Sequence, residues 1–372
     1  MTRRVLIWVQ HLLGFGHFAR ARVISETLRD AGCQVTLVSG GFTPAPAVPS
    51  GIDFVQLPPA RSKDELFDEL VDEHGQKPAF QWYEARREAL LAAFHRVSPD
   101  VLITETFPFG RRLVELEVLA LLEAAERCVN RPRIICSVRD ILQRPRKSAR
   151  AAAMVERARR YYDAVMVHGD PNLLRLEQSF PEAAHIADHC KYTGYICKEM
   201  PAAQGARHEV LVSAGGGAAG ETLIATAIEA RSISRLRTRQ WTIVSGPLAD
   251  RAASSGEVDF SIVRQLPDFS ARLANAALSI SQAGYNTLLE TIAASTPAIV
   301  VPFETDREQE QITRARVFES LGLVRVLQSC ELGPGNLARL AEETANSSVP
   351  QHKIDFGGRE GTVRVVMEML AQ

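Results

Sequence analysis

Short runs of β-branched and aliphatic residues alternate with helical patterns along the whole of this 372-residue chain. Such alternation is typical of parallel sheets, because parallel strands need a long crossover connection and an α-helix usually supplies it. The predicted strands of the first half are Val5–Val9, Val35–Ser39, Val101–Thr104, Ile134–Val138 and Ala164–His168. Those of the second half are Glu209–Ser213, Trp241–Ser245, Ser261–Gln265, Ala277–Ser281 and Ala298–Val301. The chain is therefore predicted to be of the α/β class.

The two sets of strands predict two domains, since a chain of this length exceeds one ordinary hydrophobic core. Residues Pro201–Arg207 have the composition of a linker between them. We expect residues 1–200 and 201–372 each to form a doubly wound, Rossmann-like domain, facing each other across a cleft. Ligands of such folds bind beyond the carboxyl ends of the strands. The C-terminal helix either stays with the second domain or packs back on the first.

The composition argues against several classes of binding partner. The formal net charge is −1, with 46% hydrophobic and 23% charged residues, so no global attraction to nucleic acid is expected. No apolar stretch approaches the roughly 20 residues that span a bilayer. The six cysteines are scattered without metal-ligand spacing, and no metal site is expected. A cytoplasmic location is predicted, with at most peripheral contact to the membrane.

Two charged segments have open interpretations. The acidic segment 61–74 is expected to be an exposed loop or surface helix. The basic segment 139–160 is either a solvent-exposed helix or a surface for an anionic acceptor or lipid headgroups.

A first glycine-rich loop follows the strand Val5–Val9 and contains Gly14, Gly16 and His17. Glycines let a ligand approach the backbone, and the following helix N-terminus favours an anion. His17 is a candidate general base, because imidazole titrates near neutral pH. A nicotinamide site would need an acidic residue after the second strand, where this chain has Ser39-Gly40-Gly41.

Glu105 and Asp140 are two further candidates for the base. Each directly or closely follows a predicted strand, and strand-end carboxylates point into the ligand crevice of such sheets. Both residues are equally consistent with a helix cap or an ion pair to a neighbouring arginine.

A second glycine-rich loop contains Ser213, Gly215 and Gly216 after the strand Glu209–Ser213. It lacks the Gly-Lys-Ser/Thr ending of a P-loop, so ATP hydrolysis is not indicated. Backbone N–H groups of this loop remain candidates for binding a diphosphate.

The most informative segment runs from Ser281 to Gln311. Gly284 follows a predicted strand, and Asn286 or Thr287 is expected to cap the next helix, at whose start a phosphate would bind. Glu290 lies one turn further along, where a carboxylate can accept both hydroxyls of a ribose. Glu310 and Gln311 then offer hydrogen-bonding groups for sugar hydroxyls.

The pattern S-x-x-G-x-x-T-x-x-E-x6-P-x4-P, followed by Glu310-Gln311, is similar to the donor signature of MurG-like GT-B glycosyltransferases of the family 28 type. The resemblance implies a UDP-sugar as co-substrate, commonly UDP-N-acetylglucosamine, and no other cofactor. It implies that Gly284 and Thr287 bind the diphosphate, Glu290 the ribose, and Glu310 and Gln311 the sugar. Leu266 would line the uracil. Gln282 and Glu310 depart from the family pattern, and they leave the diphosphate contacts and the sugar open.

The sequence therefore predicts a hexosyltransferase that acts without a metal ion. An acceptor hydroxyl, deprotonated by His17, would attack the anomeric carbon of the UDP-sugar. The acceptor is unknown, either lipid-linked or a small molecule. Two alternatives remain: a UDP-sugar hydrolase of the PseG type, and a non-enzymatic protein that binds nucleotide sugars.

Overall fold

The computed structural model describes residues 2–42, 48–64, 68–145, 147–205, 207–214, 218–246, 259–305 and 308–371. The chain divides into two compact units. The first holds Met1–Ile196 together with Asp355–Gln372, and the second holds Cys197–Ile354. The end of the chain, which the boundary at residue 200 assigns to the second domain, thus packs with the N-terminal unit.

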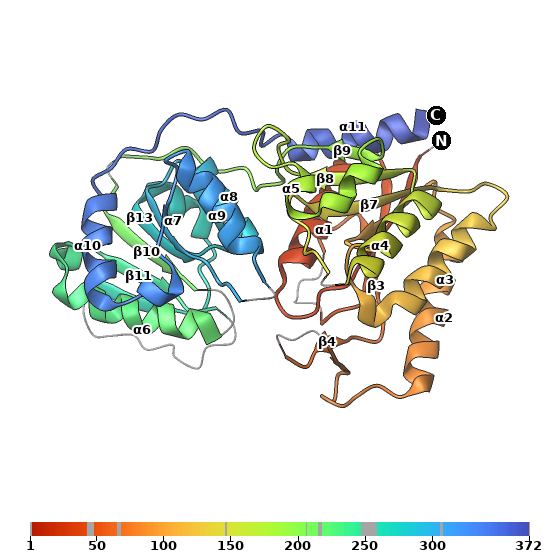
Figure 1. Cartoon of the computed structure of the whole chain (residues 1–372), viewed down its shortest axis with the longest axis horizontal. Coiled ribbons are helices and arrows are strands. Elements are labelled where there is room, and N and C mark those ends of the chain that lie inside the picture. Colours follow the sequence, from red (N-terminus) through yellow and green to blue (C-terminus); the bar gives the residue numbers. More distant parts are fainter. Residues whose placement is uncertain are drawn as a thin grey trace. The chain divides into compact units, whose positions relative to one another are not determined.

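The N-terminal unit is built on a parallel sheet of seven strands, in the order β3-β2-β1-β6-β7-β8-β9. Strands β3, β7, β8 and β9 of this sheet are labelled in Figure 1. The seven strands are β1 (Arg4–Val9), β2 (Gln34–Ser39), β3 (Ile52–Gln56), β6 (Val101–Glu105), β7 (Arg133–Arg139), β8 (Ala164–His168) and β9 (Cys190–Tyr192). Five of them confirm the predicted strands, whereas the edge strands β3 and β9 were not predicted. The winding direction reverses between β1 and β6, which is where sheets of this topology bind ligands.

Helices cover both faces of this sheet. Alternate residues of β1 join different layers, because successive side chains of a strand point to opposite faces. Val5 and Ile7 pack with α1 and α11, whereas Leu6 and Trp8 pack with α2, α3 and α4. The helices are α1 (Gly16–Asp30), α2 (Phe80–Val97), α3 (Glu115–Glu126), α4 (Ser148–Tyr161), α5 (Leu176–Ser179) and α11 (Gly358–Ala371), with 3-10 turns at Arg112–Val114 and Pro181–Ile186.

The acidic segment 61–74 differs from its prediction. Its described part forms a small antiparallel pair, β4 (Arg61–Ser62) and β5 (Leu70–Val71), in place of an exposed loop or helix. Leu70 and Val71 are buried, and Leu70 joins the main core of the unit. The burial of these two adjacent apolar side chains thus determines where the segment packs, despite its many charged residues.

The basic segment is helical as predicted over α4. Two arginines of this helix contact acidic side chains: Arg157 pairs with Glu115, and Arg159 lies 3.3 Å from Asp188. Arg146 lies outside the described residues.

The C-terminal unit has a six-stranded parallel sheet in the order β12-β11-β10-β13-β14-β15. Its strands are β10 (Glu209–Ser213), β11 (Trp241–Val244), β12 (Phe260–Val263), β13 (Ala276–Gln282), β14 (Ala298–Val301) and β15 (Arg325–Val326). The five predicted strands are confirmed and β15 is additional. The helices are α6 (Ala218–Ile233), α7 (Phe269–Asn275), α8 (Tyr285–Ala293), α9 (Glu310–Ser320) and α10 (Pro334–Thr344), with 3-10 turns at Arg235–Thr238 and Ser329–Glu331. The winding direction reverses between β10 and β13.

The close packing of α11 on the N-terminal unit can be tested at Gly361. A Cβ at this position would lie 2.0 Å from the carbonyl oxygen of Thr193, a backbone atom that cannot move aside freely. Gly361→Ala should therefore lower the free energy of unfolding by about 1–3 kcal/mol, measured by urea denaturation. The matched control is Gly335→Ala in α10, where a Cβ meets no atom within 4 Å. This control should be neutral or stabilising by up to about 1 kcal/mol, and equal losses in both variants would contradict the packing argument.

Candidate functional site

His17 and Glu105 meet where the N-terminal sheet reverses its winding. His17 lies in the first turn of α1, directly after the loop that leaves β1, and Glu105 is the last residue of the neighbouring strand β6. The Nδ1 atom of His17 lies 3.0 Å from both carboxylate oxygens of Glu105. An ionised carboxylate only accepts hydrogen bonds, so Nδ1 carries the proton and Nε2 keeps its lone pair. The described residues provide no hydrogen-bond partner for Nε2.

The Glu105 carboxylate is held by a set of donors. It is 1% exposed, forms an ion pair with the buried Arg20, and accepts a 2.7 Å hydrogen bond from the Thr106 hydroxyl. The Arg111 guanidinium lies 3.8 Å away. Burial alone would raise the pKa of Glu105, but the charge of Arg20 and the hydrogen bond from His17 bring this pKa well below its ordinary value. Glu105 is therefore ionised and shielded from solvent. These properties suit a residue that orients His17 better than they suit a general base, which was the role that the sequence allowed.

The pKa of His17 is lowered from its ordinary value, first by burial and then by the positive charge of Arg111, against the opposite effect of Glu105. The start of a helix acts in the same direction, because its dipole disfavours a cation there. A neutral imidazole at pH 7 is the form that can take up a proton. With 24% of its side chain exposed, His17 is also reachable from solvent.

Asp140 was a further candidate for the general base, but its position does not fit this role. Its side chain is fully buried just after β7, and its Oδ2 accepts a 3.1 Å hydrogen bond from the hydroxyl of Tyr195. The carboxylate thus joins β7 to the chain segment after β9, and solvent does not reach it. Of the three candidate bases, only His17 is partly exposed.

Gly14 and Gly16 flank the exposed Phe15 in the loop before α1. A Cβ at Gly14 would meet no atom within 4 Å, and neither glycine has a positive φ. The fold itself therefore does not require glycine at position 14. Because Gly14 has no side chain, the backbone is accessible three residues before His17.

In the C-terminal unit, β10 and β13 pair so that Ser213 lies opposite Ser281 at their carboxyl ends. Ser281 is fully buried, and its hydroxyl has no hydrogen-bond partner among the described residues. Gly215 and Gly216, predicted to continue this edge after Ser213, lie outside the described residues.

Helix α8 begins two or three residues earlier than predicted. Gly284 is its N-cap residue, and neither Asn286 nor Thr287 caps the helix through its side chain. These two are instead the second and third helical residues, whose N–H groups have no partner within the helix. Gly284 is open, with no atom within 4 Å of a Cβ position. The start of α8 thus presents backbone donors suited to an anion.

Glu290 lies on α8 as predicted and is unusual among the buried carboxylates. Its side chain is 8% exposed, yet the described residues give its carboxylate neither a hydrogen bond nor an ion pair. Burial raises its pKa, and the charge of Lys198 opposes this only in part. A buried carboxylate without partners is costly unless a ligand supplies donors.

The remaining predicted residues lie at the far strands of the same sheet. Glu310 is the first residue of α9 and accepts a 2.8 Å hydrogen bond from Arg314. Gln311 accepts a 3.0 Å hydrogen bond from the backbone N–H of Phe303 through its side-chain oxygen. Leu266 is half-buried after β12 and packs against the small core cluster near α7.

Arg314, which follows Glu310-Gln311 at the [NR] position of the family pattern, has a role in this site that the sequence did not assign. It is fully buried, binds Glu310, and its guanidinium carbon lies 4.8 Å from the centre of the Tyr285 ring. It therefore links the first residue of α8 to the first turn of α9. The available signal was the four-residue spacing from Glu310, which brings two helical side chains together.

No group of three or more His, Cys, Asp or Glu side chains in the described ranges could hold a metal ion. Among the same residues, no helix has both the length and the apolar character needed to cross a membrane.

Residues 210–354 match the model of the glycosyltransferase family 28 C-terminal domain. This part of the chain is similar to the C-terminal domain of family 28 glycosyltransferases. A curated relative from Brucella anthropi is a UDP-N-acetylglucosamine–N-acetylmuramyl-(pentapeptide) pyrophosphoryl-undecaprenol N-acetylglucosamine transferase. It is 32% identical over 79 residues, which is 21% of this chain and 21% of that protein.

Solved structures resemble the whole chain. The calicheamicin glycosyltransferase CalG4 matches with a TM-score of 0.61 at 17% identity, over 100% of this chain and 95% of its own. Acinetobacter baumannii MurG matches with a TM-score of 0.56 at 16% identity, over the same shares of the two chains. At these identities the likeness concerns the fold, which is GT-B with two Rossmann-like domains. Together with the match to the family 28 domain model, this fold makes the chain MurG-like, as the motifs predicted.

Three histidines of the N-terminal unit predict a loss of stability in mild acid. The pKa of His11, His17 and His168 is lowered, in each case first by burial. The unfolded chain binds protons at these residues below about pH 6.5, whereas the folded one does not, so stability falls as the pH drops below that value. His17 and His168, whose pKa lies furthest below the ordinary value, should each contribute a loss of about 1.4 kcal/mol per pH unit in the free energy of unfolding below about pH 6.5, measured by urea denaturation between pH 7 and 5.

Substitutions test the assignment. His168 lies between the hydroxyls of Ser137 and Thr193, 2.9 Å from each. His168→Asn should reduce the slope of stability against pH, whereas replacement of the exposed His74 should leave the slope unchanged. A slope that does not depend on His168 would contradict its assignment as a neutral buried group.

Proposed function

We propose that this protein transfers a hexose from a UDP-sugar to an acceptor hydroxyl. The bond between the anomeric carbon and the diphosphate oxygen breaks, a bond from that carbon to the acceptor oxygen forms, and UDP leaves. The acceptor proton passes to Nε2 of His17. The acceptor and the base are assigned to the N-terminal unit, and the donor to the C-terminal unit.

The pairing of His17 with Glu105 is the observation that carries the proposal. It leaves Nε2 as the free, neutral nitrogen of an exposed imidazole, as a general base requires. When His17 takes up the proton, the ionised Glu105 stabilises the resulting cation at 3.0 Å. Arg20 and Thr106 keep the carboxylate ionised and in position.

For the donor, we assign the diphosphate to the N-terminus of α8 and the ribose to Glu290. The N–H groups of Asn286 and Thr287 supply donors to phosphate oxygens, and the open backbone at Gly284 lets the phosphate approach. Two ribose hydroxyls would supply the partners that the Glu290 carboxylate lacks. The name of the Brucella anthropi relative supports UDP-N-acetylglucosamine as the first donor to test, with similar hexose donors next.

We propose that catalysis proceeds without a bound metal ion or other cofactor. Helix N-termini and loop amides stabilise the negative charge that develops on a leaving diphosphate.

The acceptor is proposed to be a hydroxyl compound, either small or lipid-linked. The relative from Brucella anthropi is named for an undecaprenol-linked acceptor, which supports testing lipid-linked compounds first. Such an acceptor would place the protein at the inner face of the membrane.

The first experiment compares release of UDP from UDP-sugars with and without a panel of small and lipid-linked acceptors. Transfer predicts slow release without an acceptor and a glycosylated product with one. Fast release from the donor and water alone would instead identify a hydrolase. A protein that binds UDP-sugars but never releases UDP would be a binding protein.

His17→Ala should reduce kcat by about 10²–10⁴-fold, because the acceptor proton loses its base. Affinity for UDP, measured by calorimetry, should stay within a few-fold of wild type. Ala in place of the exposed His74 is the control and should preserve kcat. Loss of UDP affinity in His17→Ala would make His17 a ligand-binding residue instead.

The variant Glu105→Gln tests whether Glu105 acts on His17 through its negative charge or only through its hydrogen bond. It keeps a hydrogen-bond acceptor beside Nδ1 but removes the charge that raises the pKa of His17. The acid limb of the profile of kcat/KM against pH should move to lower pH, and kcat should fall because the cation that forms on His17 is less stabilised. An unchanged pH profile would contradict the assigned role of Glu105.

Glu290→Ala should weaken UDP binding by about 1–3 kcal/mol, the cost of leaving ribose hydroxyls without their acceptor. The same change at the exposed Glu229 of α6 is the control and should leave affinity unchanged. Because an uncompensated buried carboxylate is removed, the variant should not lose stability without UDP. An unaltered affinity would refute the ribose assignment.

A further inference from the structure

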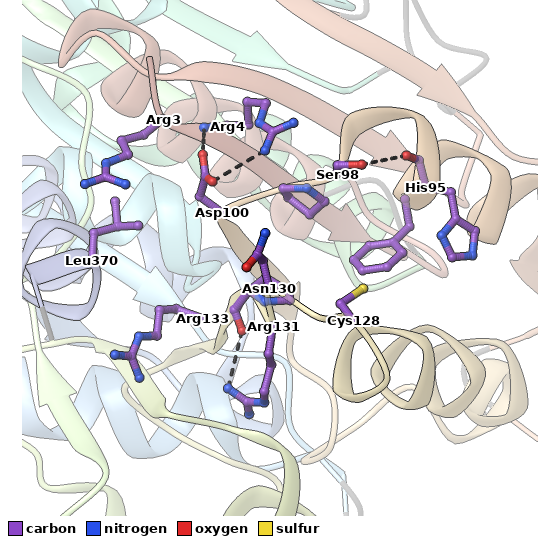
Figure 2. Close-up of a pocket in the computed structure, with 13 residues that line it drawn as sticks. Arg3, Arg4, His95, Ser98, Asp100, Cys128, Asn130, Arg131, Arg133 and Leu370 are labelled. Atoms are coloured by element: carbon purple, nitrogen blue, oxygen red, sulfur yellow. Dashed lines mark hydrogen bonds and ion pairs between the residues drawn. The ribbon is translucent and has the colours of Figure 1, made fainter. Parts of the chain in front are cut away.

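A cavity of about 450 Å³ lies in the N-terminal unit, at the amino ends of β1, β6 and β7 (Figure 2). Arg4 and Arg133 begin β1 and β7, and Asp100 directly precedes β6. His17 and Glu105 follow the opposite, carboxyl ends of β1 and β6. The cavity is therefore separate from the proposed acceptor site, and its volume is within the usual range for small-molecule sites.

Positive charge dominates the lining of this cavity. Four arginines line it, Arg3, Arg4, Arg131 and Arg133. Three carboxylates pair with them: Asp100 lies 3.5 Å from Arg4, Glu126 lies 2.6 Å from Arg131, and Asp163 lies 2.8 Å from Arg131 and 3.7 Å from Arg133. One cation thus remains without a matching carboxylate.

Arg3 is that cation. No hydrogen bond or ion pair joins its guanidinium to another described residue, and the amide of Asn130 is likewise without a partner there. Arg133 has only the long contact to Asp163, whose Oδ2 already serves Arg131 at 2.8 Å and the backbone N–H of Ile134 at 2.7 Å. Three side chains thus retain donor groups for a ligand.

The same cavity has an apolar side. Leu370 of α11 lies between Arg3 and Arg133 in the close-up, with both guanidinium groups on the same side of the cavity (Figure 2). Pro99 and Pro132 are buried and add apolar surface to the lining. Guanidinium groups bind carboxylates and phosphates through paired hydrogen bonds, and apolar surface favours a carbon body over a bare ion.

We propose that this cavity binds a small organic anion, a carboxylate or phosphate ester with a compact apolar body. The anionic group sits between Arg3 and Arg133 with Asn130 as a further donor, and the carbon body lies against Leu370. One unmatched cation suits one anionic group. The site is independent of the proposed transferase site and requires no sugar donor.

The test uses the full chain and four probes: phenyl phosphate, benzoate, inorganic phosphate and the neutral benzyl alcohol. Calorimetric titration should give saturable binding of phenyl phosphate or benzoate, weaker binding of inorganic phosphate, and none of benzyl alcohol. The double variant Arg3→Gln/Arg133→Gln should weaken binding of the aromatic anion at least about tenfold, since it removes two charge-assisted contacts. Both side chains are at the surface, so the fold should tolerate the change.

Two controls make the result decisive. Arg127→Gln removes a charge from the same unit at a side chain that is 78% exposed and does not line the cavity. The affinity of Arg127→Gln for the aromatic anion should stay within about twofold of wild type. If this variant lost as much affinity as the double variant, the effect would reflect general electrostatic attraction and not a specific site. Binding should also persist in saturating UDP and in Glu290→Ala, and displacement by UDP would assign the anion to the donor site instead. Absence of saturable binding by either aromatic anion would overturn the proposal.

Discussion

The buried carboxylate of Glu105 is the constraint on which the N-terminal unit depends. A carboxylate at 1% exposure is tolerated only when cations and donors surround it. Arg20 from α1 and Thr106 from the following loop satisfy this need, and His17 completes it. The same contacts fix α1 against the end of β6, so the requirement that stabilises the fold also orients the imidazole.

The two units share the same sheet topology, but the pKa values of their buried glutamates are shifted in opposite directions. Each places its candidate residues where the winding of the sheet reverses, at β1 and β6 in one unit and at β10 and β13 in the other. Glu105 is surrounded by partners, and its pKa is lowered, whereas Glu290 lacks them, and its pKa is raised. The first arrangement suits a residue that acts through a neighbour within the protein. The second suits one whose partners arrive with a ligand.

The sequence predicted the central strands and the position of most candidate residues, because buried parallel strands are continuous apolar runs. The edge strands β3, β9 and β15 were missed, since they are short and mix polar with apolar residues. The partners of the site were harder to foresee. Arg20 and Arg314 are charged residues within helices, and local pattern assigns such residues to the surface. Their burial follows from contacts with Glu105 and Glu310, of which the first is 85 residues away in the chain.

Strand β6 shows how one fold can carry two sites that need not influence each other. Asp100 precedes it and Glu105 ends it, so about 16 Å of strand separates the arginine-lined cavity from the base and its partner. All five of its residues are buried, and it is paired on both sides by β1 and β7. Such a strand resists displacement, because its hydrogen bonds and packing change together. An anion bound at one end therefore has no evident means of moving Glu105 at the other, and the two proposals stand on separate contacts.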